Sequence, residues 1–179
     1  MSYWTIFLSF VIFSVIGWIF ESAICSPIGR HQLENRGFLI GPWCPIYGFG
    51  VIGCYLLFGR LRSMLLLIVL SAVFCCALEF ATSYVMEKWL NRRWWDYSGM
   101  PWNLNGRICL YGAVLFGVAS AVVCRYVMPY FLHVYAETGQ KEIRYLSSIY
   151  AILLIADGCV SVVRACNRRA TFATTSAER

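Results

Sequence analysis

Residues 63–86, SMLLLIVLSAVFCCALEFATSYVM, form an apolar run with a single charged side chain, Glu79. At about 1.5 Å of rise per residue, a helix over this run is about 36 Å long, which exceeds the ~30 Å hydrocarbon core of a bilayer. The run is therefore predicted to be a transmembrane helix. A charged group in hydrocarbon is costly, so Glu79 is expected to face the interior of the protein and to have a partner there.

Further apolar runs lie on both sides of it, at 3–25, 42–59, 108–128 and 145–163. The chain of 179 residues is 60% hydrophobic and 13% charged, whereas a soluble domain carries roughly 25% charged residues. This composition excludes a soluble enzyme, a disordered chain and a disulfide-stapled secreted scaffold. We predict an all-α fold: a polytopic transmembrane helical bundle of about five spans.

One transmembrane domain is expected over residues 1–165, followed by a polar C-terminal tail at 166–179. Two segments of this domain, 1–59 and 63–128, share an order of motifs: Glu, then Asn-Arg, Pro-Trp and Tyr-Gly. The matched residues are Glu21 and Glu79, Asn35 and Asn91, Pro42 and Pro101, and Tyr47 and Tyr111. This order indicates two parallel two-helix repeats plus a fifth helix. A chance alignment in an aromatic-rich chain is the alternative.

The charge distribution predicts an orientation. Five spans place residues 26–41, residues 87–107 and the C-terminal tail on one side, and these segments hold ten of the 15 Lys and Arg residues. Cytoplasmic loops collect Lys and Arg, so we predict a cell-membrane protein with its N-terminus outside and its C-terminus in the cytoplasm. The same rule explains the net charge of +6, so the expected partner is the lipid bilayer and not nucleic acid.

No metal site, cofactor or catalytic residue is predicted. The chain has nine Cys and two His residues, but it contains no CxxC pair and the histidines are far apart in sequence. The motifs GxxxxGK[ST], GxSxG and HExxH are absent. Six cysteines within apolar runs are expected to be buried packing residues: Cys54, Cys75, Cys76, Cys109, Cys124 and Cys159.

Small residues recur on the fourth run, where Ala113, Gly117 and Ala121 are four residues apart. Such a ladder lets two helices approach closely in lipid. Packing within the chain is the favoured interpretation, and a homo-oligomer interface is the alternative.

The polar residues of the predicted cytoplasmic side suggest a site. Three acids lie at similar depth near this side, Glu21, Glu79 and Asp157, and the loops supply arginines as natural partners for them. Asp157 is the acid that loop anchoring explains least well. The pairs either staple the loops to the helices or line a polar cavity open to the cytoplasm. The candidate substrate-binding residues are Glu21, Arg36, Glu79, Arg93, Asp96, Arg107 and Asp157.

Aromatic residues surround Asp96: Trp94, Trp95, Tyr97 and Trp102. An interfacial aromatic belt is the favoured interpretation of this group. The wall of a binding site for a ring or a lipid headgroup is the alternative. Prolines and glycines at residues 41–45 predict an irregular start for the second run.

Two motif blocks carry a resemblance to a known family. The first is residues 35–50, NRGFLIGPWCPIYGFG, and the second includes residues 78–80, LEF, residues 93–98, RWWDYS, and residues 106–108, GRI. Over residues 14–128 the chain resembles a family of small bacterial integral membrane proteins, the ABC-transporter permeases of "type IV". The resemblance implies a transport role and, as a partner, a separate ATPase subunit.

Three functions stay open. The favoured one is a transporter or permease component for a small solute or lipid-like substrate, acting through the cytoplasm-facing cavity. The second is a membrane scaffold or regulator whose ion pairs are purely structural. The third and least favoured is a membrane-embedded enzyme acting on a lipid-linked substrate.

Overall fold

The computed structural model describes residues 2–25, 37–91 and 93–177. Most of this part is helical. The first helices are α1 (Tyr3–Ile19), which continues into a π-helical turn η1 (Phe20–Cys25), α3 (Pro45–Phe58) and α4 (Met64–Leu90). They are followed by α5 (Leu110–Val122), which continues into a second π-helical turn η2 (Val123–Val127), and by α6 (Met128–Glu137) and α7 (Gln140–Ala177). Two short strands, β1 (Asn103–Leu104) and β2 (Ile108–Cys109), form an antiparallel hairpin between α4 and α5.

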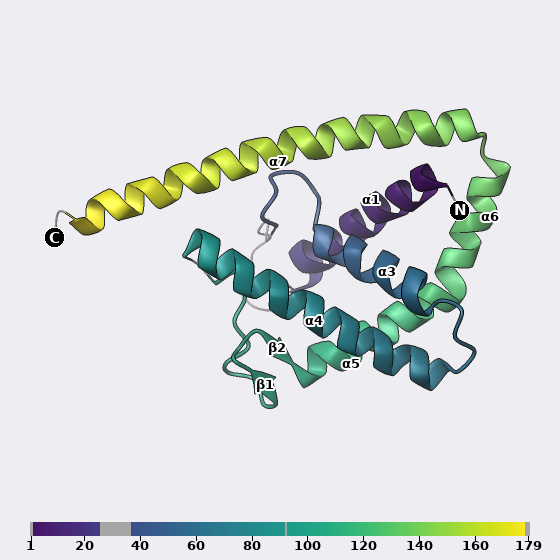
Figure 1. Cartoon of the computed structure of the whole chain (residues 1–179), viewed down its shortest axis with the longest axis horizontal. Helices are drawn as coiled ribbons and strands as arrows, with labels where there is room; N and C mark the ends of the chain where they lie inside the picture. The colour runs from purple at the N-terminus through teal and green to yellow at the C-terminus, as the bar shows by residue number, and fades with distance from the viewer. Residues whose placement is uncertain (1, 26–36, 92, 178–179) are drawn as a thin grey trace.

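Four helical segments of the described residues are long and apolar enough to cross a membrane: Tyr3–Ser22, Met64–Leu90, Leu110–Glu137 and Gln140–Asn167. This confirms the predicted all-α transmembrane bundle. The helices α1, α3, α4 and α5 run back and forth, and α7 passes along the bundle and extends beyond it (Figure 1). The loops before α3 and before α5 therefore lie at the same end of the bundle, toward which α7 also runs (Figure 1).

The second expected span is shorter than the others. Helix α3 has 14 residues, which corresponds to about 21 Å, less than the ~30 Å core. It begins at Pro45 because proline fits the first turn of a helix but interrupts its interior. The preceding segment folds back onto α1, where the amide of Cys44 donates to the carbonyl of Ser14 at 2.9 Å.

Small residues set the helix contacts within the chain. A Cβ on Gly117 of α5 would lie 2.8 Å from the carbonyl oxygen of Ile68 and from the Cβ of Ala72, both on α4. Ala121, one turn further along α5, is fully buried in the same contact, next to Leu67. The ladder that contains these two residues thus packs α5 against α4, as the favoured interpretation predicts.

Buried thiols are part of the core. Cys54, Cys75 and Cys124 lie in one cluster with Leu67 and Ala121, and the sulfur atoms of Cys54 and Cys75 are 3.8 Å apart. Cys109 is also buried and Cys76 is half-buried. The expectation of burial is wrong for Cys159, which is exposed because its part of α7 buries little surface against the bundle.

The C-terminal third of the chain bends twice. The helix that begins with α5 turns at η2, close to Pro129, so that α6 crosses one end of the bundle before α7 starts (Figure 1). Helix α7 has 38 residues, a length of about 57 Å, and it continues to Ala177. The expected polar tail is therefore helical over most of its length.

Contact between α7 and the bundle is limited. Only 11% of its most apolar window is buried inside the protein. Ile143 packs near Leu8 of α1, and the hydroxyl of Ser147 donates to the carbonyl of Trp4 at 3.1 Å. Most of the apolar surface of α7 thus faces outward, as expected for a lipid-exposed helix.

The two hairpins each bring a tyrosine to a carboxylate. Tyr47 contacts Glu21 in the first hairpin and Tyr97 contacts Glu79 in the second. Tyr111, which the motif order equates with Tyr47, is 65% exposed. The tyrosine that binds Glu79 is thus Tyr97, and not Tyr111 as the matched order of motifs would suggest. The duplication itself stays a prediction.

Candidate functional site

Helix α4 presents a polar line to the loop that follows it. Its buried polar residues Ser71, Glu79 and Ser83 lie on one face together with Cys75, at a spacing of four residues, and Glu87 continues the series one turn later. Residues four apart lie on the same face of a helix. Residues 93–109 fold back over this face, so side chains of the loop meet acids and hydroxyls of α4.

The outer part of this contact is an ion-pair network, here called the arginine staple: Glu87, Arg93, Asp96 and Arg107. Nη1 of Arg107 lies 2.7 Å from Oε2 of Glu87, and Nε of Arg93 lies 3.3 Å from the same oxygen. Nη1 of Arg93 also lies 3.3 Å from Oδ1 of Asp96. Since Glu87 belongs to α4 and the other three residues belong to the loop, the staple holds the loop on the end of the helix.

Arg107 is the most enclosed member of the staple, with 12% of its side chain exposed. Its Nη1 donates to the hydroxyl of Ser83 at 3.1 Å. The guanidinium carbon lies 5.7 Å from the ring centre of Phe80 and 5.5 Å from that of Tyr84, a cation–π arrangement on both rings. Its planar guanidinium group thus satisfies a carboxylate and a hydroxyl while it packs against aromatic faces.

The loop is also ordered by its own hairpin. Asn105 and Gly106 have φ values of 55° and 66°, and the amide of Arg107 donates to the carbonyl of Leu104 at 3.0 Å to close the turn. Asn-Gly is the preferred dipeptide for such a turn, and this signal could have predicted the hairpin from the sequence. The indole of Trp95 donates to the carbonyl of Arg107 at 3.0 Å, which fixes one side of the loop to the other.

Asp96 is exposed and organises the loop locally. Its Oδ1 accepts hydrogen bonds from the hydroxyl of Ser98 at 2.5 Å and from the amide of Ser98 at 3.0 Å. These bonds, together with Arg93, hold the pKa of Asp96 below its ordinary value. The carboxylate is therefore a charged structural centre of the loop.

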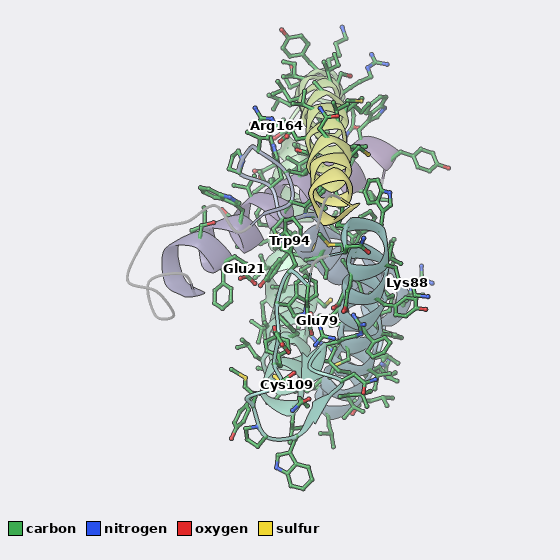
Figure 2. The ribbon with its side chains drawn as sticks, turned by 90° about the vertical axis from the view of Figure 1, so that its left-hand side faces the viewer. Glu21, Glu79, Lys88, Trp94, Cys109 and Arg164 are labelled. Atoms are coloured by element: carbon green, nitrogen blue, oxygen red, sulfur yellow. The ribbon has the colours of Figure 1, made fainter. Side chains whose placement is uncertain are left out.

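Deeper in the bundle lies a second group, here called the carboxylate–tyrosine cluster: Glu21, Tyr47, Glu79 and Tyr97. The hydroxyl of Tyr47 donates to Oε1 of Glu21 at 2.7 Å, and the hydroxyl of Tyr97 donates to Oε1 of Glu79 at 2.9 Å. The two carboxylates are close enough to interact electrostatically. Both are labelled in the view onto the loop-bearing end of the molecule (Figure 2).

Glu79 is the buried acid of this cluster. It is 6% exposed, and its Oε2 has no hydrogen-bond partner among the described residues. Burial raises the pKa of the Tyr97 phenol above its ordinary value, and the charges of Glu79 and Glu21 add to this effect. Tyr97 therefore keeps its proton and acts as the donor to Oε1, which leaves Oε2 as the unsatisfied atom.

Asp157 lies on α7 and anchors the other loop. Its two carboxylate oxygens accept hydrogen bonds from the backbone amides of Ile40 at 2.9 Å and Gly41 at 2.8 Å. The hydroxyl of Ser161, one turn further along, donates to Oδ1 at 3.0 Å. Asp157 therefore does anchor a loop, and the expectation that loop anchoring explains it least well is wrong. The groups that it binds are backbone amides, which no sequence motif reveals.

The seven sequence-predicted site residues fall into separate groups. Glu21 and Glu79 share the carboxylate–tyrosine cluster, whereas Arg93, Asp96 and Arg107 share the arginine staple. Asp157 binds loop amides, and Arg36 lies outside the described residues.

The expected pairing of loop arginines with the three deep acids is wrong for Arg93 and Arg107. Both bind Glu87, while Glu79 takes the neutral phenol of Tyr97. A phenol can be buried without the desolvation of a second charge, which favours this partner at depth. Sequence reasoning missed Glu87 and the two tyrosines as contacts, although the four-residue spacing from Glu79 to Ser83 and Glu87 indicated one helix face.

The surface beside the hairpin contains an open groove of about 340 Å³. Its lining is almost wholly apolar and includes Cys76, Leu104, Ile108 and Leu110. Trp102, also at its rim, is 80% exposed. This groove therefore does not have the polar character of the cavity that the sequence predicts.

Trp94 and Trp95, in contrast to Trp102, have contacts inside the protein. Trp94 packs edge-on against Phe38, with ring centres 5.9 Å apart, and Phe38 belongs to the loop before α3. The aromatic residues near Asp96 thus join the two loops of this end as well as facing the surroundings.

The comparisons with known proteins identify a family. A family model described as "Putative ABC-transporter type IV" matches residues 8–162. No curated protein and no solved structure matches the chain. The matched range includes most of α1, both hairpin loops and the first part of α7. It contains all of the carboxylate–tyrosine cluster and the arginine staple. This chain therefore belongs to the ABC-transporter type IV family.

Proposed function

We propose that the protein is a membrane-spanning component of a transporter for a small solute or lipid-like substrate. In this proposal it works with a separate ATPase subunit, and the end that carries the loops faces the cytoplasm. Glu21 and Glu79 form the polar centre of the pathway, with Tyr47 and Tyr97 as their hydrogen-bond partners.

The observation that carries this proposal is the unsatisfied oxygen of Glu79 inside a membrane-spanning helix. Ionisable residues within membranes are costly, and where they occur they mark substrate or ion pathways. A residue that served packing alone could be an apolar side chain of similar volume at lower cost. Membership of an ABC-transporter family supports a role in transport.

The first test is native mass spectrometry of the full chain, purified gently from its own membrane. The proposal predicts a stoichiometric complex with an ATP-hydrolysing subunit. A homo-oligomer that carries only lipid would contradict the ABC-type mechanism, and the mass of its ligand would then identify the bound class of molecule.

A second test addresses Glu79 directly. Untargeted metabolite analysis of a deletion strain, complemented with the wild-type gene, identifies solutes whose distribution depends on the protein. Glu79→Gln is expected to abolish this complementation at an unchanged level in the membrane. Glu142→Gln, which alters an exposed acid at the start of α7, serves as the matched control and should complement fully.

A scaffold or regulator is the second candidate, and one observation favours it: Arg93 and Arg107 are both satisfied by groups of the protein. If the staple is purely structural, the double swap Glu87→Arg with Arg107→Glu should restore complementation that each single change removes. Failure of the double swap with the protein still folded would count against a purely structural role.

A further inference from the structure

Glu79 is in an unusual state for a buried acid. Its Oε1 accepts one hydrogen bond, from Tyr97, and its Oε2 has no partner among the described residues. An ionised carboxylate accepts hydrogen bonds at both oxygens, and its burial without such partners is strongly unfavourable. An additional group is therefore expected at Oε2.

The surroundings decide what this group is. The groups that face Glu79 are Tyr97 from the loop, Glu21 from the end of α1, and Cys76 from the preceding turn of α4. The nearest guanidinium, that of Arg107, is engaged by Ser83 and Glu87 further along α4. Glu79 thus has an acidic neighbour, Glu21, and no described cation in contact with it.

The ligand count argues against a metal ion. No group of three or more His, Cys, Asp and Glu side chains suited to a metal occurs among the described residues. The hydroxyl groups of Tyr47 and Tyr97 keep their hydrogens and donate them to the carboxylates. As neutral phenols, the two tyrosines are weak ligands for a metal ion. A divalent ion needs about six oxygen ligands, which this cluster does not supply.

We propose that Oε2 of Glu79 is a proton-binding site, with Glu21 as the second carboxylate of the pair through which the proton is exchanged with water. This deepens the proposed function, because it names the proton as the ion handled at the same cluster. Two carboxylates that interact electrostatically favour retention of a proton by one of them. In the step itself an O–H bond forms at Oε2 as hydronium gives up a proton, and the same bond breaks when the proton returns to water.

The division of roles follows from the two environments. Glu79 is almost fully buried, whereas Glu21 is half-buried and lies in the π-helical turn at the end of α1. Glu21 is therefore the group nearer to the aqueous side, and Glu79 is the deeper proton acceptor. Tyr97 does not relay the proton, since its hydroxyl hydrogen is already donated to Oε1 of Glu79.

The experiment is infrared difference spectroscopy of the full-length protein in lipid nanodiscs during a pH titration. A protonated carboxyl group has a C=O stretching band above the amide I region, and an ionised one does not. The wild type is expected to show such a band that appears and disappears with pH. Glu79→Gln should lose it, and Glu21→Gln should displace the pH range over which it appears.

Glu142→Gln is the control, since Glu142 is an exposed acid at the start of α7 and belongs neither to the cluster nor to the loop that carries Tyr97. It should leave the band in place. Should Glu79→Gln fail to fold, Tyr97→Phe tests the same assignment, because loss of the bond to Oε1 should shift the frequency of the band without abolishing it.

Two results would overturn the proposal. One is the absence of any titrating carboxyl band that depends on Glu79 while the protein stays folded. The other is a band or carboxylate signal that responds to sodium, potassium or an alkylamine at constant pH, which would indicate a cation site instead. Neither readout needs transport, so the proton site and the proposed function can fail independently.

Discussion

At the scale of single residues, Arg107 makes the most varied set of contacts in the loop that follows α4. It joins Glu87, Ser83, Phe80 and Tyr84, so Arg107→Ala should leave Glu87 with one arginine and expose two rings. We expect a loss of about 1–3 kcal/mol in the free energy of unfolding. Thermal unfolding in detergent measures this loss, and Lys141→Ala, at an exposed position on α7, should have almost no effect.

The variant Arg107→Lys distinguishes the contribution of the positive charge at this position from that of the planar guanidinium group. An ammonium group can keep one ion pair but cannot form the planar fork or the double ring contact. The lysine variant is thus expected to fall between the wild type and Arg107→Ala in unfolding temperature. A lysine variant as stable as the wild type would show that charge alone holds the loop.

Asp96 makes the stability of the loop depend on pH. Its pKa in the folded protein is lowered by the two Ser98 hydrogen bonds and by Arg93, so its contribution is present above the unfolded carboxyl pKa of about 3.9 and is lost as the pH falls through the folded value. The unfolding temperatures of the wild type and Asp96→Asn should therefore converge in acid. If the two unfolding temperatures differed by the same amount at every pH, the ionised carboxylate of Asp96 would not be the source of the stabilisation.

At the scale of elements, the contact between α4 and α5 depends on the absence of a side chain at Gly117. A Cβ at this position would be 2.8 Å from both the Ile68 carbonyl oxygen and the Ala72 Cβ. Gly117→Val is expected to push the helices apart and to cost about 1–3 kcal/mol. Gly158→Val on α7, where a Cβ would have no neighbour within 4 Å, controls for helix propensity, and equal unfolding temperatures for the two variants would contradict the packing argument.

At the scale of the whole molecule, α7 contacts the loop before α3 through a carboxylate and through apolar side chains. Asp157 accepts hydrogen bonds from the amides of Ile40 and Gly41, and Tyr150 and Leu154 of α7 pack in one cluster with Trp43 of the same loop. Asp157→Ala should accelerate hydrogen exchange at these two amides, as measured by mass spectrometry at peptide resolution. Ser161→Ala removes only one bond to Asp157, so it should change the exchange much less.

The contacts discussed above, except that between α4 and α5, lie at the loop-bearing end of the bundle. The staple fixes the loop after α4, Asp157 fixes the loop before α3, and Phe38 and Trp94 connect the two loops. The carboxylate–tyrosine cluster lies beneath this assembly. Changes in the loops are consequently expected to reach Glu79 through Tyr97, which belongs to the loop and donates to the buried acid.

Much of the architecture could be predicted from the sequence. Apolar runs of 20 or so residues with few charges admit only helices in a bilayer, because each backbone hydrogen bond must be formed within the segment. The same physics identified Glu79 as a buried acid, since a lone carboxylate in the run at 63–86 has to face the protein interior. The family could also be recognised from contiguous motifs, and its match over residues 8–162 confirms that resemblance.

The partners of these residues were decided only by the tertiary structure. Tyr97 meets Glu79 across 18 positions of the chain, and Asp157 meets Gly41 across 116. Such contacts depend on how far a loop folds back and on the turn at Asn105 and Gly106, whereas helical periodicity constrains only residues on the same helix. Hydrophobic burial is non-directional and roughly additive, so composition predicts it; hydrogen bonds and ion pairs require particular atoms at particular distances, and these arise when the segments pack.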